Sequence, residues 1–162
     1  MILQNFKKAI GGALANAGND RIVAVNVNGE EQALAYSGGV SMMTNNLGKE
    51  NVYDVNQYSA LLLGTGTGEI TEDDYCLFEI FSDYTTVSVQ LLPQYGIRGS
   101  KDLIILNKTI QNTSDTPFTI TEMGWAGKYD RLPACMFTHD LLETPVTLQP
   151  DDMYTFTLRI KL

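Results

Sequence analysis

A histidine and a carboxylate stand side by side in this chain, because Asp140 directly follows its only histidine, His139. In nucleophilic and acid–base sites, such a pair works when the carboxylate holds the imidazole through a hydrogen bond. Adjacent residues of a strand point to opposite faces, so these two are poorly placed for that bond. No Gly-x-Ser-x-Gly or His-Glu-x-x-His pattern accompanies them. We therefore expect no enzyme, and a hydrolase that uses His139 is the least favoured function.

A second candidate for chemistry is the segment 64–68, in which glycines alternate with threonines. Glycines let backbone N–H groups approach a phosphate closely. A Walker loop continues with lysine and then serine or threonine, but here Glu69 and Ile70 follow the last glycine. The dinucleotide fingerprint requires a glycine where Glu69 stands. The segment is typical of a tight connection after a strand, and we expect no bound cofactor.

Carboxylates gather at residues 69–74, at Asp130 and at residues 151–152, and oxygen ligands of this kind suit calcium. None of these groups has the spacing of an EF-hand loop. Aspartates in turns commonly accept hydrogen bonds from nearby backbone N–H groups, which accounts for the same clusters without an ion. We therefore expect no metal site.

The two cysteines, Cys76 and Cys135, belong to no Cys-x-x-Cys pattern, and two residues cannot form a disulfide framework. Free cysteine is among the most buried residue types. We expect two reduced thiols in the core, and a single bridge between them is the alternative.

Length and composition bound the class of protein. The 162 residues suit one domain, and 44% hydrophobic with 19% charged residues indicates a soluble globular chain. The 11 basic and 19 acidic residues give a net charge of −8, which repels phosphate backbones, so nucleic acid is not an expected partner. No apolar run approaches the roughly 20 residues of a membrane span, and no secretory leader is recognisable, so we expect no membrane association.

Residues 1–17 predict an amphipathic helix, because apolar side chains recur at steps of three or four. Gly11 and Gly12 interrupt it, each at a cost of about 1 kcal/mol relative to alanine, so the helix needs a partner surface. Two partners remain open: the core of the same domain, or a neighbouring subunit that the segment reaches as an arm. For the second case the predicted anchors are Ile2, Leu3, Phe6 and Ile10.

Residues 18–162 predict one β-rich domain that begins with a hairpin. Val23, Val25 and Val27 alternate on one face before turn residues Asn28-Gly29, and a second strand follows over 32–36. Residues 37–57 show no periodicity and are predicted as a long loop, a kind of element that often binds other molecules.

Further strand patterns follow at short spacing, over residues 58–63, 75–81, 85–92, 103–111, 118–123, 146–148 and 154–162. In the last of them, Tyr154, Phe156, Leu158 and Ile160 alternate with polar residues and are predicted to face the core. Strands do not alternate with helices, so we expect a mostly β fold, an antiparallel β-sandwich or jelly roll with a short N-terminal amphipathic helix.

Three segments of the second half carry a family resemblance. They are Gly64-Thr65-Gly66-Thr67 with Asp74-Tyr75 and Leu77, then Asn112-Thr113-Ser114 with residues 118–125, and finally residues 140–152 with the last strand. Over residues 60–162 the chain resembles small structural proteins of tailed bacteriophages. Asp151 stands where that pattern usually has glycine, and His139 where arginine often precedes the aspartate. The resemblance implies a virion component that works by assembly.

The expected function is therefore protein–protein assembly in a phage virion, with capsid, portal or tail subunits and further copies of the chain as partners. A capsid-associated decoration or auxiliary protein is the first hypothesis, and a head-to-tail connector, collar or tail-fibre component is the alternative in the same setting. A host- or glycan-binding module is the alternative of another class, with Trp125, Tyr129 and loop 37–57 as contacts. The predicted interface residues are thus Ile2, Leu3, Phe6, Ile10, Trp125 and Tyr129.

Overall fold

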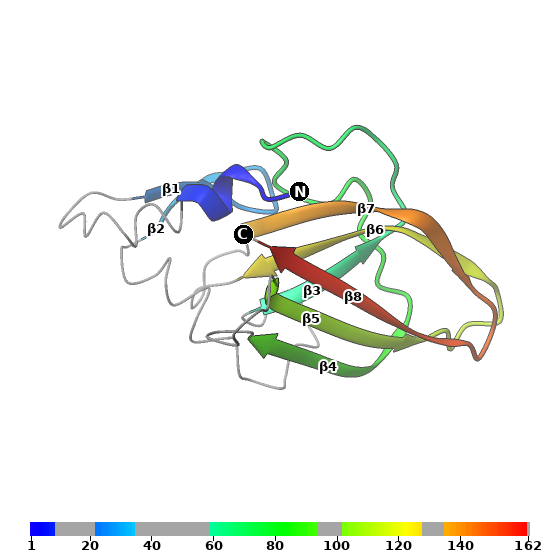
Figure 1. Cartoon of the computed structure of the whole chain (residues 1–162). Coiled ribbons are helices and arrows are strands. Elements are labelled where there is room, and N and C mark those ends of the chain that lie inside the picture. Colours follow the sequence, from blue (N-terminus) through cyan, green and yellow to red (C-terminus); the bar gives the residue numbers. More distant parts are fainter. Residues whose placement is uncertain (9–21, 35–58, 94–101, 128–134, 162) are drawn as a thin grey trace.

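The computed structural model describes residues 1–8, 22–34, 59–93, 102–127 and 135–161 (Figure 1). Within these ranges the chain forms eight strands, and residues 4–8 are helical. The strands are β1 (Ile22–Val25), β2 (Glu31–Leu34), β3 (Ser59–Gly64), β4 (Thr85–Pro93), β5 (Asp102–Gln111), β6 (Phe118–Gly127), β7 (Cys135–Leu148) and β8 (Met153–Lys161).

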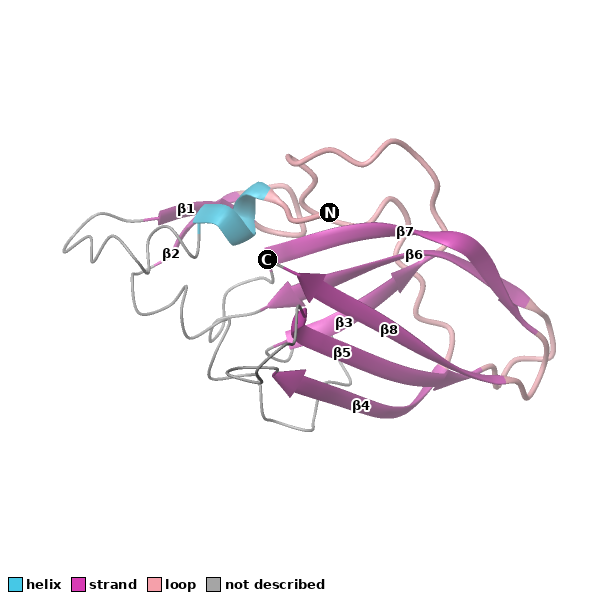
Figure 2. Ribbon diagram, viewed as in Figure 1, coloured by secondary structure: helices cyan, strands magenta, loops and turns pink. Residues whose placement is uncertain are grey.

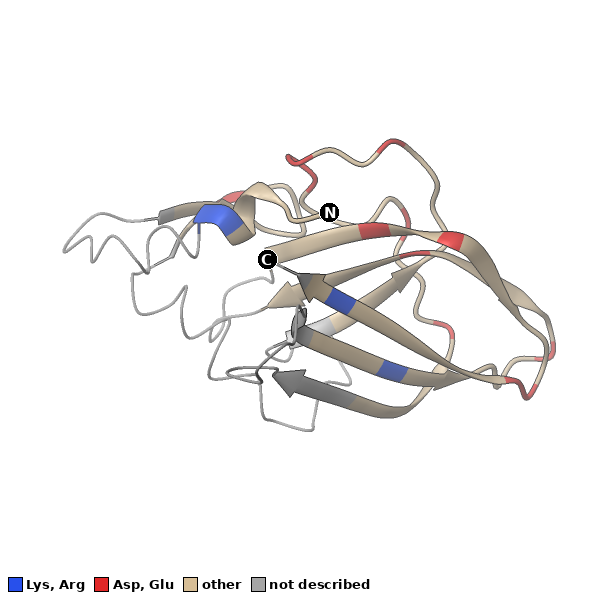
Figure 3. Cartoon of the chain, viewed as in Figure 1, with Lys and Arg blue, Asp and Glu red and all other residues tan. Residues whose placement is uncertain are grey.

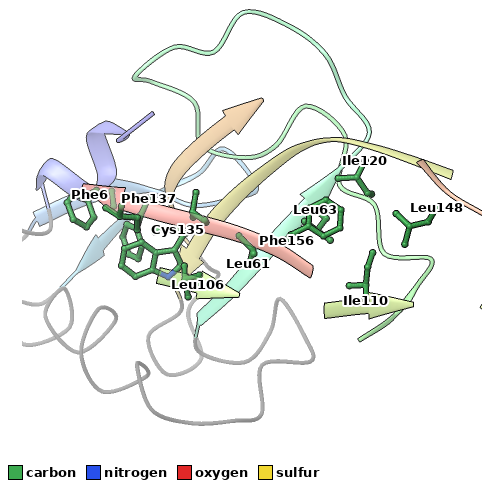
Figure 4. Close-up of a cluster of buried hydrophobic side chains, with 14 residues drawn as sticks. Phe6, Leu61, Leu63, Leu106, Ile110, Ile120, Cys135, Phe137, Leu148 and Phe156 are labelled. Atoms are coloured by element: carbon green, nitrogen blue, oxygen red, sulfur yellow. The ribbon is translucent and has the colours of Figure 1, made fainter. Parts of the chain in front are cut away.

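Two antiparallel three-stranded sheets form the body of the molecule (Figure 2). One sheet has the strand order β3-β6-β7, the other has the order β4-β5-β8, and β1 and β2 form a separate hairpin. The main hydrophobic core draws on both sheets, with Leu61 and Phe137 from the first and Leu106, Phe156 and Leu158 from the second (Figure 4). The predicted mostly β, antiparallel fold class is confirmed.

Alternation in β5 and β8 agrees with the sequence pattern, because Phe156, Leu158 and Ile160 are buried. Tyr154 is an error in the predicted core, since it is 44% exposed. It lies near the start of β8, where its ring packs on that of Phe156 with centroids 4.9 Å apart. The strand therefore extends past the region that the opposite sheet covers.

The first predicted hairpin is present as β1 and β2. Val23 is exposed, whereas Ala24 and Asn26 are buried. The Asn5 side chain bonds to the backbone N–H and C=O of Val25, at 3.0 and 2.7 Å.

The strand predicted over residues 75–81 is also wrong. Residues 65–84, between β3 and β4, form no strand, and their one β-bridge joins Ile80 to Gly64. β6 and β7 are longer than predicted, because bulges between Ile120 and Glu122 and between Trp125 and Ala126 shift the alternation. The loop predicted over 37–57 lies outside the described residues, so its role is untested.

The N-terminal residues belong to the body of this domain. Leu3 donates its backbone N–H to Phe137 O at 2.9 Å, and the His139 N–H is bonded to Met1 O at 3.0 Å, so residues 1–3 extend the sheet beside β7. Leu3 and Phe6 are buried, and Asn5 also donates to Met136 O. Of the two partners that the sequence left open, the described residues 1–8 contact the core of the same domain.

Asp151 stands where the bacteriophage-like pattern usually has glycine. Its φ of 67° lies in the left-handed region, which favours glycine but which aspartate tolerates better than most residues. Backbone hydrogen bonds hold the turn, from Asp151 N to Asn112 O at 2.8 Å and from Asn112 N to Asp152 O at 2.9 Å. The turn expected of a glycine therefore forms with aspartate.

Both cysteines are free, and Cys135 is buried whereas Cys76 is half-buried. Burial raises the pKa of the Cys135 thiol to about 11. Among the described residues, no helix is long and apolar enough to cross a membrane.

We expect Phe6→Ala to lower the free energy of unfolding by about 3–5 kcal/mol, because truncating a buried aromatic leaves a cavity. The Phe6 ring packs against both Trp125 and Phe137, with centroids 5.9 and 6.2 Å away. Urea unfolding measures the loss, and Met153→Ala, at a position 63% exposed, is the control with a change within about 0.5 kcal/mol. An unchanged midpoint for Phe6→Ala would show that residues 1–8 do not stabilise the domain.

Candidate functional site

His139 is fully buried and joins two carboxylates, neither of them Asp140. Its Nδ1 lies 2.8 Å from Asp74 Oδ2, and its Nε2 lies 2.8 Å from Glu122 Oε2. Asp140 contacts the amino group of Met1 instead. The expectation that His139 and Asp140 do not pair is confirmed, and the true partners are distant in sequence.

Strand pairing brings two members of this cluster together. His139 on β7 lies opposite Gly124 on β6, and Glu122 is two residues along β6 on the same face. That face points away from the main core, because Ile120 and Trp125 fill the core side of β6. The third member, Asp74, comes from residues 65–84, which connect β3 to β4 and which we name the covering segment.

The Glu122 carboxylate is the centre of the cluster. Its Oε1 accepts the backbone N–H groups of Gly66 and Glu79, at 3.0 and 2.8 Å. Its Oε2 accepts the Phe78 N–H at 3.0 Å and faces the His139 ring. Both oxygens therefore have two polar partners each, which is what burial of a carboxylate requires.

The glycines that suggested a phosphate loop serve this carboxylate. A Cβ atom on Gly64 would lie 2.4 Å from Glu122 Oε1, and one on Gly66 would lie 2.7 Å from the same atom. Any side chain at either position would displace Glu122. The anion that the glycine-rich backbone approaches is thus part of the same chain.

The covering segment forms a third layer on the outer face of the β3-β6-β7 sheet. Leu77 is buried there in a second small core, whose other members are Leu3, Leu62, Ala126 and Met136. Phe78 packs its ring on His139, with centroids 4.8 Å apart. Lys7 pairs with Glu72 at 2.8 Å and holds the pKa of that carboxyl below its usual value.

This geometry limits what His139 does chemically. Each nitrogen of the His139 ring lies within hydrogen-bond distance of a carboxylate oxygen of the same chain. Neither nitrogen is left to take a proton from a substrate. Asp74 and Glu122 also lie on opposite sides of the ring, and among the described residues no three His, Cys, Asp or Glu side chains form a group fit for a metal ion.

The other acidic clusters bond mainly within the chain. Asp74 Oδ1 accepts the Thr71 hydroxyl at 2.7 Å, and Asp152 accepts the Gln149 N–H at 2.8 Å. The prediction that such carboxylates accept backbone N–H groups of local turns is confirmed at Asp152. Asp74 instead bonds to the Thr71 hydroxyl and to His139. Asp130 lies outside the described residues.

Three of the predicted interface residues lie in the interior. Leu3, Phe6 and Trp125 are buried, and the Trp125 ring packs against Phe137 with centroids 5.0 Å apart. Leu3 belongs to the second core and Phe6 to the main core, so their apolar surface is already covered by their own chain. Trp125 likewise offers no face to a glycan.

Ile2 is half-buried and bridges to Thr138 on β7. Ile10 and Tyr129 lie outside the described residues, and their role stays a prediction.

No family model, no curated protein and no solved structure matches this chain.

Lys108 is a second buried ionisable group, located on β5 between the two sheets. Its Nζ donates to Leu61 O at 3.1 Å and to the Tyr84 hydroxyl at 2.8 Å, and it lies 4.8 Å from the centre of the Tyr84 ring. Burial lowers the pKa of Lys108 to about 8 and raises that of Tyr84 to about 12. The charged form of Lys108 therefore destabilises the folded state at neutral pH.

We expect Glu122→Gln to lower the free energy of unfolding by about 3–5 kcal/mol, because an NH₂ group would face backbone N–H donors and His139 would lose a buried anion. Urea unfolding measures this loss. Glu143→Gln, on the exposed part of β7, is the matched control. Equal midpoints for the two variants would contradict the assigned role of Glu122.

A second experiment uses Lys108→Met and pH. Between pH 8 and 10.5, Lys108 is protonated in the unfolded chain but neutral in the folded protein. The contribution of Lys108 to the parent protein's free energy of unfolding therefore rises with pH. The stability of Lys108→Met relative to the parent should therefore fall by a few kcal/mol between about pH 7 and pH 10. Urea unfolding across this range checks it, and parallel curves for the two proteins would exclude a lowered pKa.

Proposed function

We propose that this chain is a structural protein of a tailed-phage virion that acts by binding other virion subunits, as a capsid-associated decoration or auxiliary protein. Two supports are independent of each other. One is the resemblance of residues 60–162 to such proteins. The other is a surface of the covering segment on which large apolar side chains remain exposed.

That surface is the observation on which the proposal rests. Phe78, Ile80 and Leu141 are 41%, 44% and 40% exposed. All three adjoin Glu122, because Phe78 donates its N–H to this carboxylate, Ile80 follows Glu79, and Leu141 lies opposite Glu122 across the β6-β7 pair. We name these three side chains the apolar patch.

The apolar patch is carried by a fixed backbone. Glu122 holds the segment at Gly66, Phe78 and Glu79, and Leu77 anchors it in the second core. A surface that is already ordered loses little conformational entropy when a partner covers it. Exposed apolar groups on a rigid support are typical of protein–protein contact sites.

The mechanism follows from this arrangement. Covering the apolar patch removes apolar surface from water, at about 25 cal/mol for each Å². A subunit bound across neighbouring capsid subunits opposes their separation when packaged DNA presses outward. The contact lies on the covering segment and β7, and Leu3 packs with Leu77 beneath the covering segment.

The experiment is quantitative mass spectrometry of purified particles of a phage that encodes the chain. A decoration protein is expected at a copy number comparable to that of the major capsid protein. A low copy number would favour the connector, collar or tail-fibre alternative, and absence from particles would overturn both.

The same particles test the surface. We expect Ile80→Ser with Leu141→Ser to reduce incorporation about tenfold, because a loss of about 1.4 kcal/mol in binding corresponds to that factor. The control is Val87→Ser, which changes a 46% exposed side chain of β4 on the other sheet. Normal incorporation of the double variant would exclude the apolar patch as the contact.

A further inference from the structure

The segment that carries Phe78 and Ile80 has charged side chains of one sign. Residues 59–93 contain no lysine or arginine, whereas their acidic residues are Glu69, Glu72, Asp73, Asp74, Glu79 and Asp83. Figure 3 shows this acidic distribution over the covering segment and on the adjoining part of β7. Glu69, Asp73, Glu79 and Asp83 are exposed, and so is Glu143 on β7.

Two of the acidic residues already have partners, since Asp74 bonds to His139 and Glu72 pairs with Lys7. Glu79 is different, because its backbone N–H binds Glu122 while its side chain is exposed. It stands between Phe78 and Ile80 in the sequence. The apolar side chains and the carboxylates of the surface are therefore interleaved.

We propose that the apolar patch and its acidic surroundings bind a basic, amphipathic segment of a partner protein. The inference rests on the assembly function proposed above and specifies the chemistry of the partner. Apolar side chains of that segment cover Phe78, Ile80 and Leu141, and its lysine or arginine side chains face the carboxylates. Opposite charges speed the encounter and fix its orientation, while apolar contact supplies the affinity.

The negative charge of this surface favours one class of binding partner over the others. A second copy of the chain brings a net charge of −8 toward carboxylates, which repel it. Nucleic acid and anionic membranes are repelled for the same reason. A basic protein segment is the occupant whose charge and apolar content both match.

The experiment titrates the full chain with two synthetic helical peptides of identical length, one built of leucine and lysine and the other of leucine and glutamate. Binding is followed by calorimetry and by NMR shifts of residues 75–83. We expect the lysine peptide alone to bind, with shifts centred on Phe78 and Ile80. Raising the salt from about 0.05 to 0.5 M should weaken binding about tenfold, because exposed charges are screened.

Matched variants separate the two contributions. Glu79→Gln with Asp83→Asn should weaken binding of the lysine peptide about tenfold, and Ile80→Ser with Leu141→Ser should do the same. Asp115→Asn with Asp151→Asn removes equal charge from turns outside the covering segment and should leave binding unchanged. Equal effects of the two charge-neutralised variants would show attraction to net charge only and would overturn the proposal.

The remaining outcomes are also decisive. Equal binding of both peptides, or binding of neither, overturns the inference about the partner's charge. If the chain is incorporated into particles but does not bind the lysine peptide, this inference fails and the assembly function stands. If the peptide binds at the predicted residues but particles lack the chain, the basic-segment site stands and the virion assignment fails.

Discussion

A buried carboxylate governs much of this structure. Removing Glu122 from water costs several kcal/mol unless every lone pair finds a partner. Three backbone N–H groups of the covering segment and the His139 ring provide those partners. The same requirement explains two glycines, since Gly64 and Gly66 leave the space that the carboxylate occupies. One buried side chain on a strand thus holds the irregular backbone of the covering segment at Gly66, Phe78 and Glu79.

The sequence predicted regular strands well and irregular ones poorly. β8 and β5 pair over nearly their whole length with one shift near Asp102, so alternation reports their buried faces. β6 and β7 contain two bulges, and each bulge interrupts the period-two alternation from which a strand is predicted. Residues 75–81 alternate like a strand because Leu77 is anchored in a core while its neighbours face outward. Their backbone, however, donates to the Glu122 side chain at Phe78 and Glu79 and reaches β3 only through the Phe81 N–H.

The cluster around His139 was beyond local pattern reading for a related reason. Asp140 is the carboxylate next to His139 in sequence, but the partners of His139 are 65 and 17 residues away. Two features of the sequence belong to this cluster: a glutamate inside the strand pattern 118–123, and the alternating glycines that precede it in the chain. Neither feature by itself indicates that the other lies beside it in the fold. Similarly, periodicity showed that Leu3 and Phe6 need a partner surface without identifying it. The hydrogen bonds of Asn5 to β1 and β7 place that surface in the same chain.

Glu122 is far in sequence from its backbone donors, and this separation affects the order in which the chain folds. Its backbone partners lie 43 to 56 residues earlier in the sequence, so a large loop must close before any of them forms. The β6-β7 pair, in contrast, joins neighbouring strands and presents the carboxylate to water first. Desolvation of Glu122 then becomes favourable only when all the donors arrive together. The covering segment therefore docks late and as one unit, and a nascent chain exposes the outer face of its sheet until that step is complete.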